Sequence, residues 1–255
     1  MCELIGILIP TTSFKRKWTT FKDTIFYQIY LQSFLKTYCS NYSYVFYLIV
    51  DDDDKVFSDS IIQTEIIKYV KQNKNLSLKF ISTNGILKGW VTKMWNRAFL
   101  QAYKDGCQYF FQCGDDIMFE TKDWVHQSVE ALKKHNNVGL TGPIDNGRFV
   151  NGNPVFMPGG ARFIHTQAFV SRKHMEIFGT FFPEQIKNWF CDDWITKVYY
   201  PNHFYILKCY LKNVGGEPRY NVETNCPWET LVSQGKEKLN QYLITPSKNM
   251  KMYYF

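Results

Sequence analysis

Apolar and amphipathic segments alternate along the first 140 residues, and this order constrains the fold more than any other feature of the chain. Strands are expected where the sequence is almost continuously apolar or strand-like, at 3–9, 44–50, 76–81, 107–113 and 138–140. Helices are expected where apolar residues recur at helical spacing, at 20–38, 58–72, 89–104 and 121–135. Such an order predicts an α/β fold with a mostly parallel central sheet flanked by helices.

The second half of the chain has a different texture. A glycine-rich stretch at 142–160 is long for a connection, and we expect it to be a functional loop. Strands are expected at 161–170 and 203–211, and helices at 171–178, 185–200 and 227–243. We expect these elements to add a smaller mixed sheet, with a mobile tail at 246–255.

Composition excludes several classes of protein. The 255 residues are 45% hydrophobic and 18% aromatic, which is too apolar for a disordered chain. No apolar run approaches the ~20 residues of a membrane span, and the N-terminus lacks a basic signal-peptide region. The seven cysteines show no CxxC pair, so we expect reduced thiols and a cytoplasmic protein. The net charge of +7 comes without a nucleic-acid-binding signature, so no nucleic-acid partner is expected.

Acidic clusters follow two of the predicted parallel strands. Asp51–Asp54 come directly after 44–50, and Asp115 and Asp116 come after 107–113. Ligands of such folds bind at the carboxyl ends of the strands. Two carboxylates there suit Mg²⁺ or Mn²⁺, and we favour this over a plain Gly-Asp-Asp turn. For Asp53 and Asp54 we favour a solvated turn or helix cap, whereas Asp51 or Asp52 could bind a base or ribose.

A third acidic pair, Asp192 and Asp193, stands beside Trp194 at the start of a predicted helix. A carboxylate in that position can act as a general base for an incoming hydroxyl. A helix N-cap pair is the alternative, and the pair alone does not decide between them.

The order of these motifs resembles the GT-A class of nucleotide-sugar glycosyltransferases, especially inverting family-2-like enzymes. The resemblance covers residues 3–200. It is carried by the opening strand that ends at Pro10, by Val50-Asp51-Asp52, by the helix from Gly89 to Ala98, by Tyr109–Asp116 and by Cys191-Asp192-Asp193-Trp194. It implies a single domain, with a nucleotide-sugar-binding half at 1–116 and an acceptor-binding half at 117–245.

The resemblance also implies roles for individual residues. Nucleotide contacts are expected from Pro10, Thr11, Ser13, Asp51, Asp52, Lys93, Arg97 and Asp115. Metal contacts are expected from Asp116, from Asp115 and from His203. Arg162, His165 and Trp194 are expected near the sugar or acceptor, and Asp192 or Asp193 is the expected base. Gly114 holds the place of the first Asp of the Asp-x-Asp metal motif.

The implied activity is a metal-dependent transfer of a hexosyl or N-acetylhexosaminyl group. The donor would be a nucleotide-diphosphate sugar, with a UDP-sugar favoured, and the acceptor a hydroxyl of a glycan, protein or lipid. The cofactor would be Mn²⁺ or Mg²⁺, and the transfer would invert the anomeric centre. A sugar-nucleotide nucleotidyltransferase is an alternative, but the basic segment after Pro10 lacks the glycines expected of one. A catalytically inactive sugar-binding relative is the other.

Overall fold

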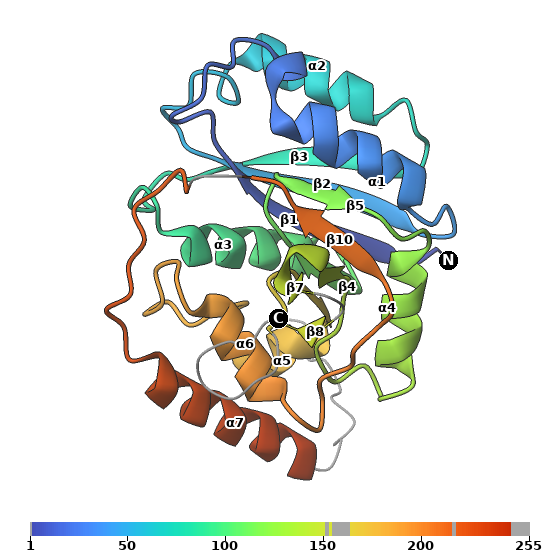
Figure 1. The fold of residues 1–255 in the computed structure, drawn as a ribbon, viewed down its shortest axis with the longest axis vertical. Coiled ribbons are helices and arrows are strands. Elements are labelled where there is room, and N and C mark those ends of the chain that lie inside the picture. The colour runs from blue at the N-terminus through green and yellow to red at the C-terminus, as the bar shows by residue number, and fades with distance from the viewer. Residues whose placement is uncertain (1, 151–152, 155–163, 216–217, 246–255) are drawn as a thin grey trace, which may run out of the picture.

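A central sheet of five strands organises the computed structural model, which describes residues 2–150, 153–154, 164–215 and 218–245. Its order is β3 (Leu76–Ser82), β2 (Ser43–Val50), β1 (Leu4–Thr11), β4 (Tyr109–Gln112) and β9 (Ala168–Ser171). The first four strands are parallel, and β9 pairs antiparallel with β4. The predicted α/β fold with a mostly parallel sheet is therefore confirmed (Figure 1).

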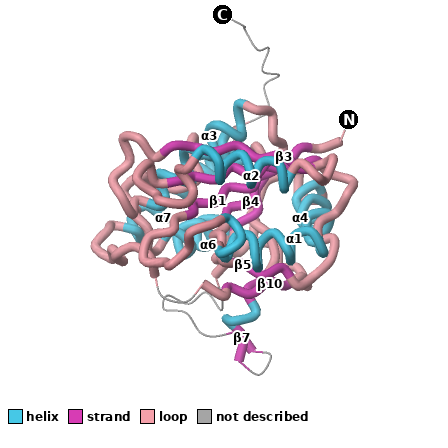
Figure 2. The backbone as a smooth tube through the Cα atoms, turned by 90° about the horizontal axis from the view of Figure 1, so that it is seen from above, coloured by secondary structure: helices cyan, strands magenta, loops and turns pink. Residues whose placement is uncertain are grey.

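Helices cover both faces of this sheet, which is why its strands are apolar on both sides. One face packs against α1 (Gln32–Thr37), α2 (Ser60–Val70) and α4 (Trp124–Lys133). The other packs against α3 (Val91–Lys104), α5 (Lys173–Phe178), α6 (Cys191–Tyr199) and α7 (Trp228–Ile244). Figure 1 shows the sheet between α1 and α2 above and α3, α6 and α7 below, and Figure 2 looks down on these layers from the side of α1 and α2. Side chains alternate along β1, with Ile7 in the first core and Leu8 in the second.

A smaller mixed sheet lies over the face that carries α1 and α4. In it β10 (Tyr210–Asn213) runs antiparallel to β5 (Ile117–Phe119) and parallel to β6 (Ile144–Asp145). A short 3₁₀ turn, Asn146–Arg148, and a hairpin of β7 (Phe149–Val150) with β8 (Asn153–Pro154) follow β6. The prediction of a smaller mixed sheet is confirmed, but the sequence did not reveal β5.

Several predicted elements differ from the structure; in the described part of the chain the strand expected at 161–170 is formed only by β9, and the helix expected at 185–200 begins at Cys191. The helix expected at 20–38 is broken into a 3₁₀ turn (Phe21–Asp23), a π-helix (Phe26–Leu31) and α1. The carboxylate of Asp23 accepts bonds from Thr19 and Thr20 and so caps the start of the 3₁₀ turn, and the first break follows this turn. The strand expected at 138–140 is reduced to a single bridge between Leu140 and Phe204. Of the strand expected at 203–211, only the end belongs to a strand, β10.

The two predicted halves are interleaved in space. β9 and α5–α7 come from the second half, yet they pack on or pair with the sheet of the first half. Asp59 caps α2 by accepting from the amides of Ile61 and Ile62. The predicted tail at 246–255 lies outside the described residues. None of the helices in the described part of the chain combines the length and apolarity that a bilayer span requires.

Candidate active site

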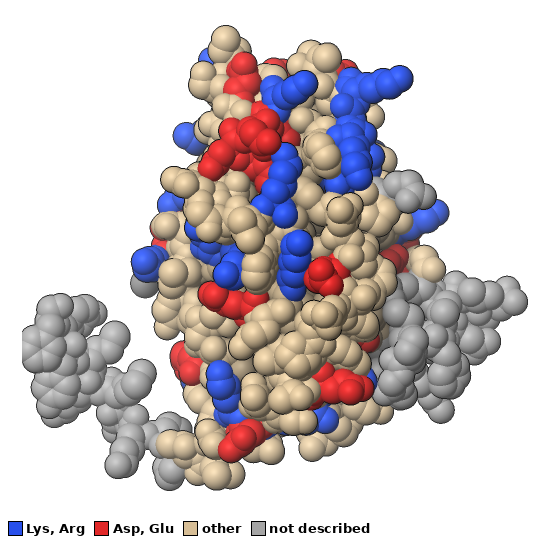
Figure 3. Space-filling model, turned by 90° about the vertical axis from the view of Figure 1, so that its left-hand side faces the viewer, with Lys and Arg blue, Asp and Glu red and all other residues tan. Residues whose placement is uncertain are grey.

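The strand order changes direction between β1 and β4, and this point defines the candidate site. From β1 the chain adds β2 and β3 on one side of the sheet, and then adds β4 on the other. Open α/β sheets bind ligands outside the carboxyl ends of the strands at such a point. Figure 3 views the side of the molecule toward which β1 runs in Figure 1. Acidic side chains gather there, with lysine and arginine side chains beside and below them.

Asp115 is the centre of this site and is fully buried. The hydroxyl of Thr11, at the end of β1, donates to its Oδ2 at 2.5 Å. The guanidinium of Arg219 donates to both carboxylate oxygens, with Nη1 2.8 Å from Oδ2. The same Nη1 lies 2.9 Å from the carbonyl oxygen of Thr12. Both carboxylate oxygens of Asp115 therefore already have protein donors.

Asp116 is more accessible, and its side chain keeps 20% of its exposure. Its Oδ2 lies 3.7 Å from Arg219 Nη2, which is longer than a hydrogen bond. Burial, and then the charge of Asp115, raises the pKa of Asp116 to about 6. The backbone of Gly215 lies so close to Oδ2 that no side chain fits at this glycine. A Cβ at Gly114 would lie 2.5 Å from Oδ1, so an acid there would require Asp116 to move.

Asp51 and Asp52 occupy different environments at the end of β2. Asp51 is buried, and its carboxylate accepts a short hydrogen bond from the hydroxyl of Tyr220. Asp52 is exposed, and its Oδ1 accepts from Ser82 Oγ at 2.7 Å. Both lie at the predicted edge of the sheet, but only Asp51 faces the segment that carries Arg219.

Asp54 is a buried structural residue rather than a solvated one. Its carboxylate accepts from Thr12 Oγ1 and Ser13 Oγ, each at 2.9 Å, and from the amide of Ser13. It also accepts from the amides of Val56 and Phe57. The polar groups of Ser13 are therefore engaged in fixing the loop after β1, and Pro10 lies within that strand. Asp54 is therefore not solvated as expected, but it caps the turn that follows it, whereas Asp53 is exposed and pairs with Lys88.

The predicted helix residues Lys93 and Arg97 lie on α3, which begins at the same edge of the sheet. Lys93 Nζ lies 4.3 Å from the centre of the Trp90 ring and 3.5 Å from Glu184 Oε2. Arg97 Nη1 donates to the carbonyl oxygen of Ser82 at 2.7 Å. Arg97 therefore braces the end of β3.

Asp192 and Asp193 lie in the first turn of α6, and both are partly exposed. The segment before α6 is held at the start of α3, because Thr92 donates its amide to Lys187 at 3.2 Å. Asn188 Nδ2 then donates to the carbonyl oxygen of Asn221 at 2.9 Å. The acidic turn of α6 is thus tied to the segment that carries Arg219 and Tyr220.

Three predicted site residues lie elsewhere. Trp194 is 3% exposed, its indole donates to the carbonyl oxygen of Leu231 between α6 and α7, and it lines a cavity of about 390 Å³ there, so its contact with an acceptor stays a prediction. His165 is also buried, with its ring against Phe204, and burial lowers its pKa to about 4. This places His165 in the interior rather than in a sugar pocket.

His203 lies in a turn after α6, and its carbonyl oxygen accepts from the amide of Leu140. Its pKa is lowered by burial and by the neighbouring His135. His203 therefore does not join Asp115 and Asp116, and its predicted metal role is wrong. Arg162 lies outside the described residues, as do 151–152 and 155–160 of the predicted loop at 142–160.

The acids at this edge fit a metal in one way only. In the described part of the chain, His, Cys, Asp and Glu side chains nowhere form a group of three able to hold an ion. Both oxygens of Asp115 already accept from Arg219 or Thr11, so Asp115 is the less available of the two acids. Asp116 has room for one contact, and Mg²⁺ is often bound by a single carboxylate together with substrate phosphates. The residues present therefore fit an ion that a diphosphate brings with it.

Sequence reasoning missed Arg219 and Tyr220, which contact the acids most closely. They lie 104 residues after Asp115 and 169 residues after Asp51 in sequence, so spacing carried no signal. The local sequence does hold a hint. A basic and an aromatic residue follow Gly215-Gly216-Glu217-Pro218, a turn-forming stretch that predicts a surface loop.

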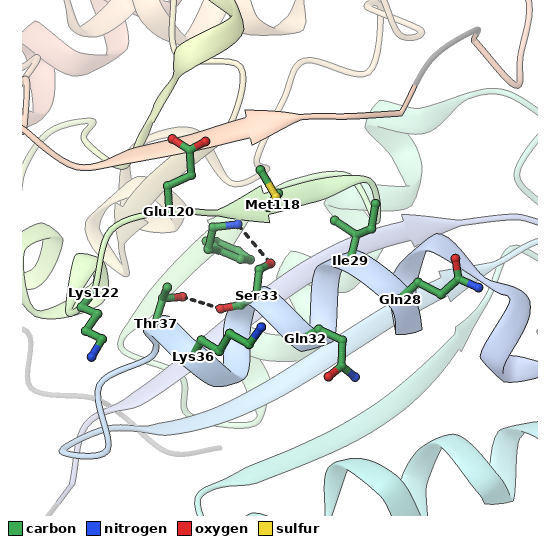
Figure 4. A pocket seen from close by; sticks show the side chains of 10 residues that line it. Gln28, Ile29, Gln32, Ser33, Lys36, Thr37, Met118, Glu120 and Lys122 are labelled. Carbon is green, nitrogen blue, oxygen red and sulfur yellow. Dashed lines mark hydrogen bonds between the residues drawn. The ribbon is translucent and has the colours of Figure 1, made fainter.

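A separate cavity of about 400 Å³ lies between the π-helix and α1 on one side and β5 on the other (Figure 4). Ile29 and Met118 line it, and Ser33 Oγ accepts from the amide of Phe119 at 3.1 Å beside it. Residues predicted for the site are absent from its described lining. The acids instead converge at the sheet edge, which is therefore the candidate active site.

The similar solved structures share a GT-A-like glycosyltransferase fold with this chain. The similar solved structures include TarS of S. aureus, a glycosyltransferase. Its 1–349 fragment is 17% identical over 82% of this chain, with a TM-score of 0.53, and this chain covers 60% of that one. The complex with UDP-GlcNAc is 16% identical over 94% of this chain, with a TM-score of 0.55 and 72% of the TarS fragment covered. A further structure of the same fragment holds UDP.

This chain covers 43% of a further TarS structure, at 15% identity and a TM-score of 0.56. Protein-family models yield no match, and neither do the curated proteins. At 15–17% identity the likeness establishes the fold alone.

Proposed function

We propose that the protein transfers a sugar from a UDP-sugar to an acceptor hydroxyl, with inversion at the anomeric carbon. One observation carries this proposal. The Thr11–Asp115–Arg219 cluster and Asp116 lie at the switch point between β1 and β4, where open α/β sheets bind nucleotides. The UDP and UDP-GlcNAc complexes of TarS support a uridine donor, and UDP-GlcNAc is the first donor to test.

In this proposal the base of the donor lies beside Asp51 and Asp52, and its diphosphate lies beside Asp116. Mg²⁺ or Mn²⁺ held by Asp116 and the diphosphate would supply charge neutralisation at the leaving group. Arg219, and Arg16 near the carbonyl of Gly215, add fixed positive charge at the same place. Neutralising the charge that develops on a leaving diphosphate is the main catalytic effect expected here.

Asp192 or Asp193 would remove the proton from the acceptor hydroxyl. The oxygen would then attack the anomeric carbon from the side opposite the diphosphate, so the configuration inverts. Trp189 precedes this acidic turn and is 51% exposed, which makes its indole the available platform for an acceptor sugar. In the proposal, Trp189 rather than Trp194 contacts the acceptor sugar.

The cellular setting belongs to the proposal as well. All seven cysteines are among the described residues and carry free thiols. Free thiols suit a reducing compartment, so we propose that the reaction takes place in the cytoplasm.

Release of nucleotide from sugar nucleotides tests the proposal directly. The protein would be incubated with UDP-GlcNAc, UDP-glucose and GDP-mannose, with and without Mn²⁺, and with Asp116→Asn as the matched control. We expect slow UDP release, by transfer to water, from at least one UDP-sugar, and much less from the variant. Equal release by both proteins, or none from any donor, would contradict the proposal.

A further inference from the structure

Tyr220 occupies the carboxylate that the proposed donor base requires. We propose that Tyr220 is a built-in competitor of the nucleotide base: its phenol holds Asp51 when no donor is bound, and an N–H of the base takes its place. This inference rests on the proposed function and concerns the regulation of the same site.

The contacts of Tyr220 resemble those of a bound base. Its hydroxyl donates a short hydrogen bond to Asp51 Oδ2. The start of its side chain packs on the backbone of Gly89, where a Cβ would lie 3.2 Å from Tyr220 Cβ. Gly89 has a φ of +81°, which favours glycine and keeps this surface flat. A flat ring with one donor aimed at a carboxylate is also what a uracil N3–H would present.

Asp51 leaves room for one such partner at a time. The residue is only 3% exposed, and the phenol of Tyr220 covers its carboxylate. A base N–H must therefore approach where the phenol now lies. The two donors exclude each other, and the apparent affinity for the nucleotide falls by the fraction of molecules in which Tyr220 is engaged.

The surroundings allow Tyr220 to leave without moving its neighbour. Arg219 stays anchored through its two bonds to Asp115. A cavity of about 370 Å³ adjoins the ring and is lined by Phe14, Lys88, Lys187 and Arg219. This volume lies in the range of small-molecule pockets, so it has room for the displaced ring. Rotation of one side chain is therefore enough to exchange phenol for base.

Binding measurements on Tyr220→Phe test the exchange, because this variant keeps the ring and loses only the hydroxyl. A hydrogen bond to a charged group shifts an equilibrium by about 10- to 100-fold. We expect the variant to bind UDP and uridine about tenfold more tightly by calorimetry, with unchanged affinity for inorganic pyrophosphate. Tyr220→Leu should shift the affinities in the same direction.

Tyr200→Phe is the matched control, since Tyr200 is 48% exposed and packs against Phe204. It should bind all three ligands as the unchanged protein does. Equal or weaker UDP binding by Tyr220→Phe and Tyr220→Leu would overturn the exchange and leave the proposed function standing. Absence of UDP binding by every protein in the set would overturn the proposed function and the exchange together.

Discussion

Arg219 forms a bidentate ion pair with the buried carboxylate of Asp115, because both terminal nitrogens of its guanidinium donate to it. The pair joins a loop near the C-terminus to the end of β4, and the hydroxyl of Thr11 ties the same carboxylate to β1. An acid that the sequence offers as a metal ligand is therefore neutralised by the protein itself. This arrangement leaves Asp116 as the carboxylate available to a substrate.

The ion pair should make Arg219 important for stability. Arg219→Ala leaves Asp115 buried without its countercharge, and breaking such a pair costs about 3–5 kcal/mol. We expect a loss of that size in the free energy of unfolding measured with urea. Arg16→Ala removes a guanidinium at the same edge that donates to the carbonyl oxygen of Gly215, and it should cost about 1 kcal/mol or less. Equal losses in the two variants would contradict the assigned role of Arg219.

Asp116→Asn should separate activity from stability. Burial and the charge of Asp115 disfavour the ionised form of Asp116, so a neutral amide should leave the protein as stable or about 1–2 kcal/mol more stable at pH 7. UDP-sugar turnover should fall by about 10²–10⁴, the usual scale for a charge-stabilising group. EDTA should lower the turnover of the unchanged protein and have little further effect on the variant. Loss of stability together with activity would indicate a structural role instead.

The sequence was sufficient to predict the architecture because local pattern and long-range packing agree in the central sheet. Continuous apolar runs such as 44–50 can be buried on both faces only in a helix-covered parallel sheet. The break in the helix at 20–38 was not predictable, because a π-turn depends on how Tyr30 and its neighbours fit the core.

For the site, the sequence identified the edge but not the contacts. Asp51, Asp115 and Asp116 were predictable because each directly follows a strand. Their partners Arg219 and Tyr220 come from a loop that reaches the site only through tertiary structure. The burial of His165 and Trp194 was not predictable, because a polar or aromatic residue near a motif carries no sign of its burial.

One of the two acids in the first turn of α6 should be required for transfer. We expect either Asp192→Asn or Asp193→Asn to lower turnover by about 10²–10⁴, since general-base groups contribute on this scale. Affinity for UDP should stay within about twofold, because the base contacts the acceptor rather than the nucleotide. Glu237→Gln, an exposed acid on α7, is the control and should behave as the unchanged protein. Near-full turnover by both Asp variants would show that the general base is neither of these two residues.

Stability should fall in acid because His174 is buried in its neutral form. One ring nitrogen lies 2.9 Å from the Tyr199 hydroxyl and the other 2.9 Å from the carbonyl oxygen of Phe181, and burial lowers its pKa to about 4. The unfolded chain binds this proton near pH 6.5, whereas the folded chain does so only near pH 4. The contribution of His174 to stability is therefore full above pH 6.5 and declines between these values, by roughly 1.4 kcal/mol per pH unit.

Urea unfolding between pH 7 and pH 4 measures this decline. His174→Gln should be less stable at pH 7 but lose less stability on acidification. His126→Gln changes an exposed histidine and should keep the slope of the unchanged protein. Identical slopes in His174→Gln and the unchanged protein would show that His174 takes up a proton in the folded state.

Hydrogen–deuterium exchange with and without UDP tests the location of the donor site most directly. The account predicts slower exchange in peptides covering 11–16, 51–54 and 114–117, which meet at the carboxyl ends of β1, β2 and β4. Peptides covering 28–37 and 118–122, which line the cavity between α1 and β5, should be unchanged. Protection confined to that cavity, with none at the three strand ends, would contradict the account.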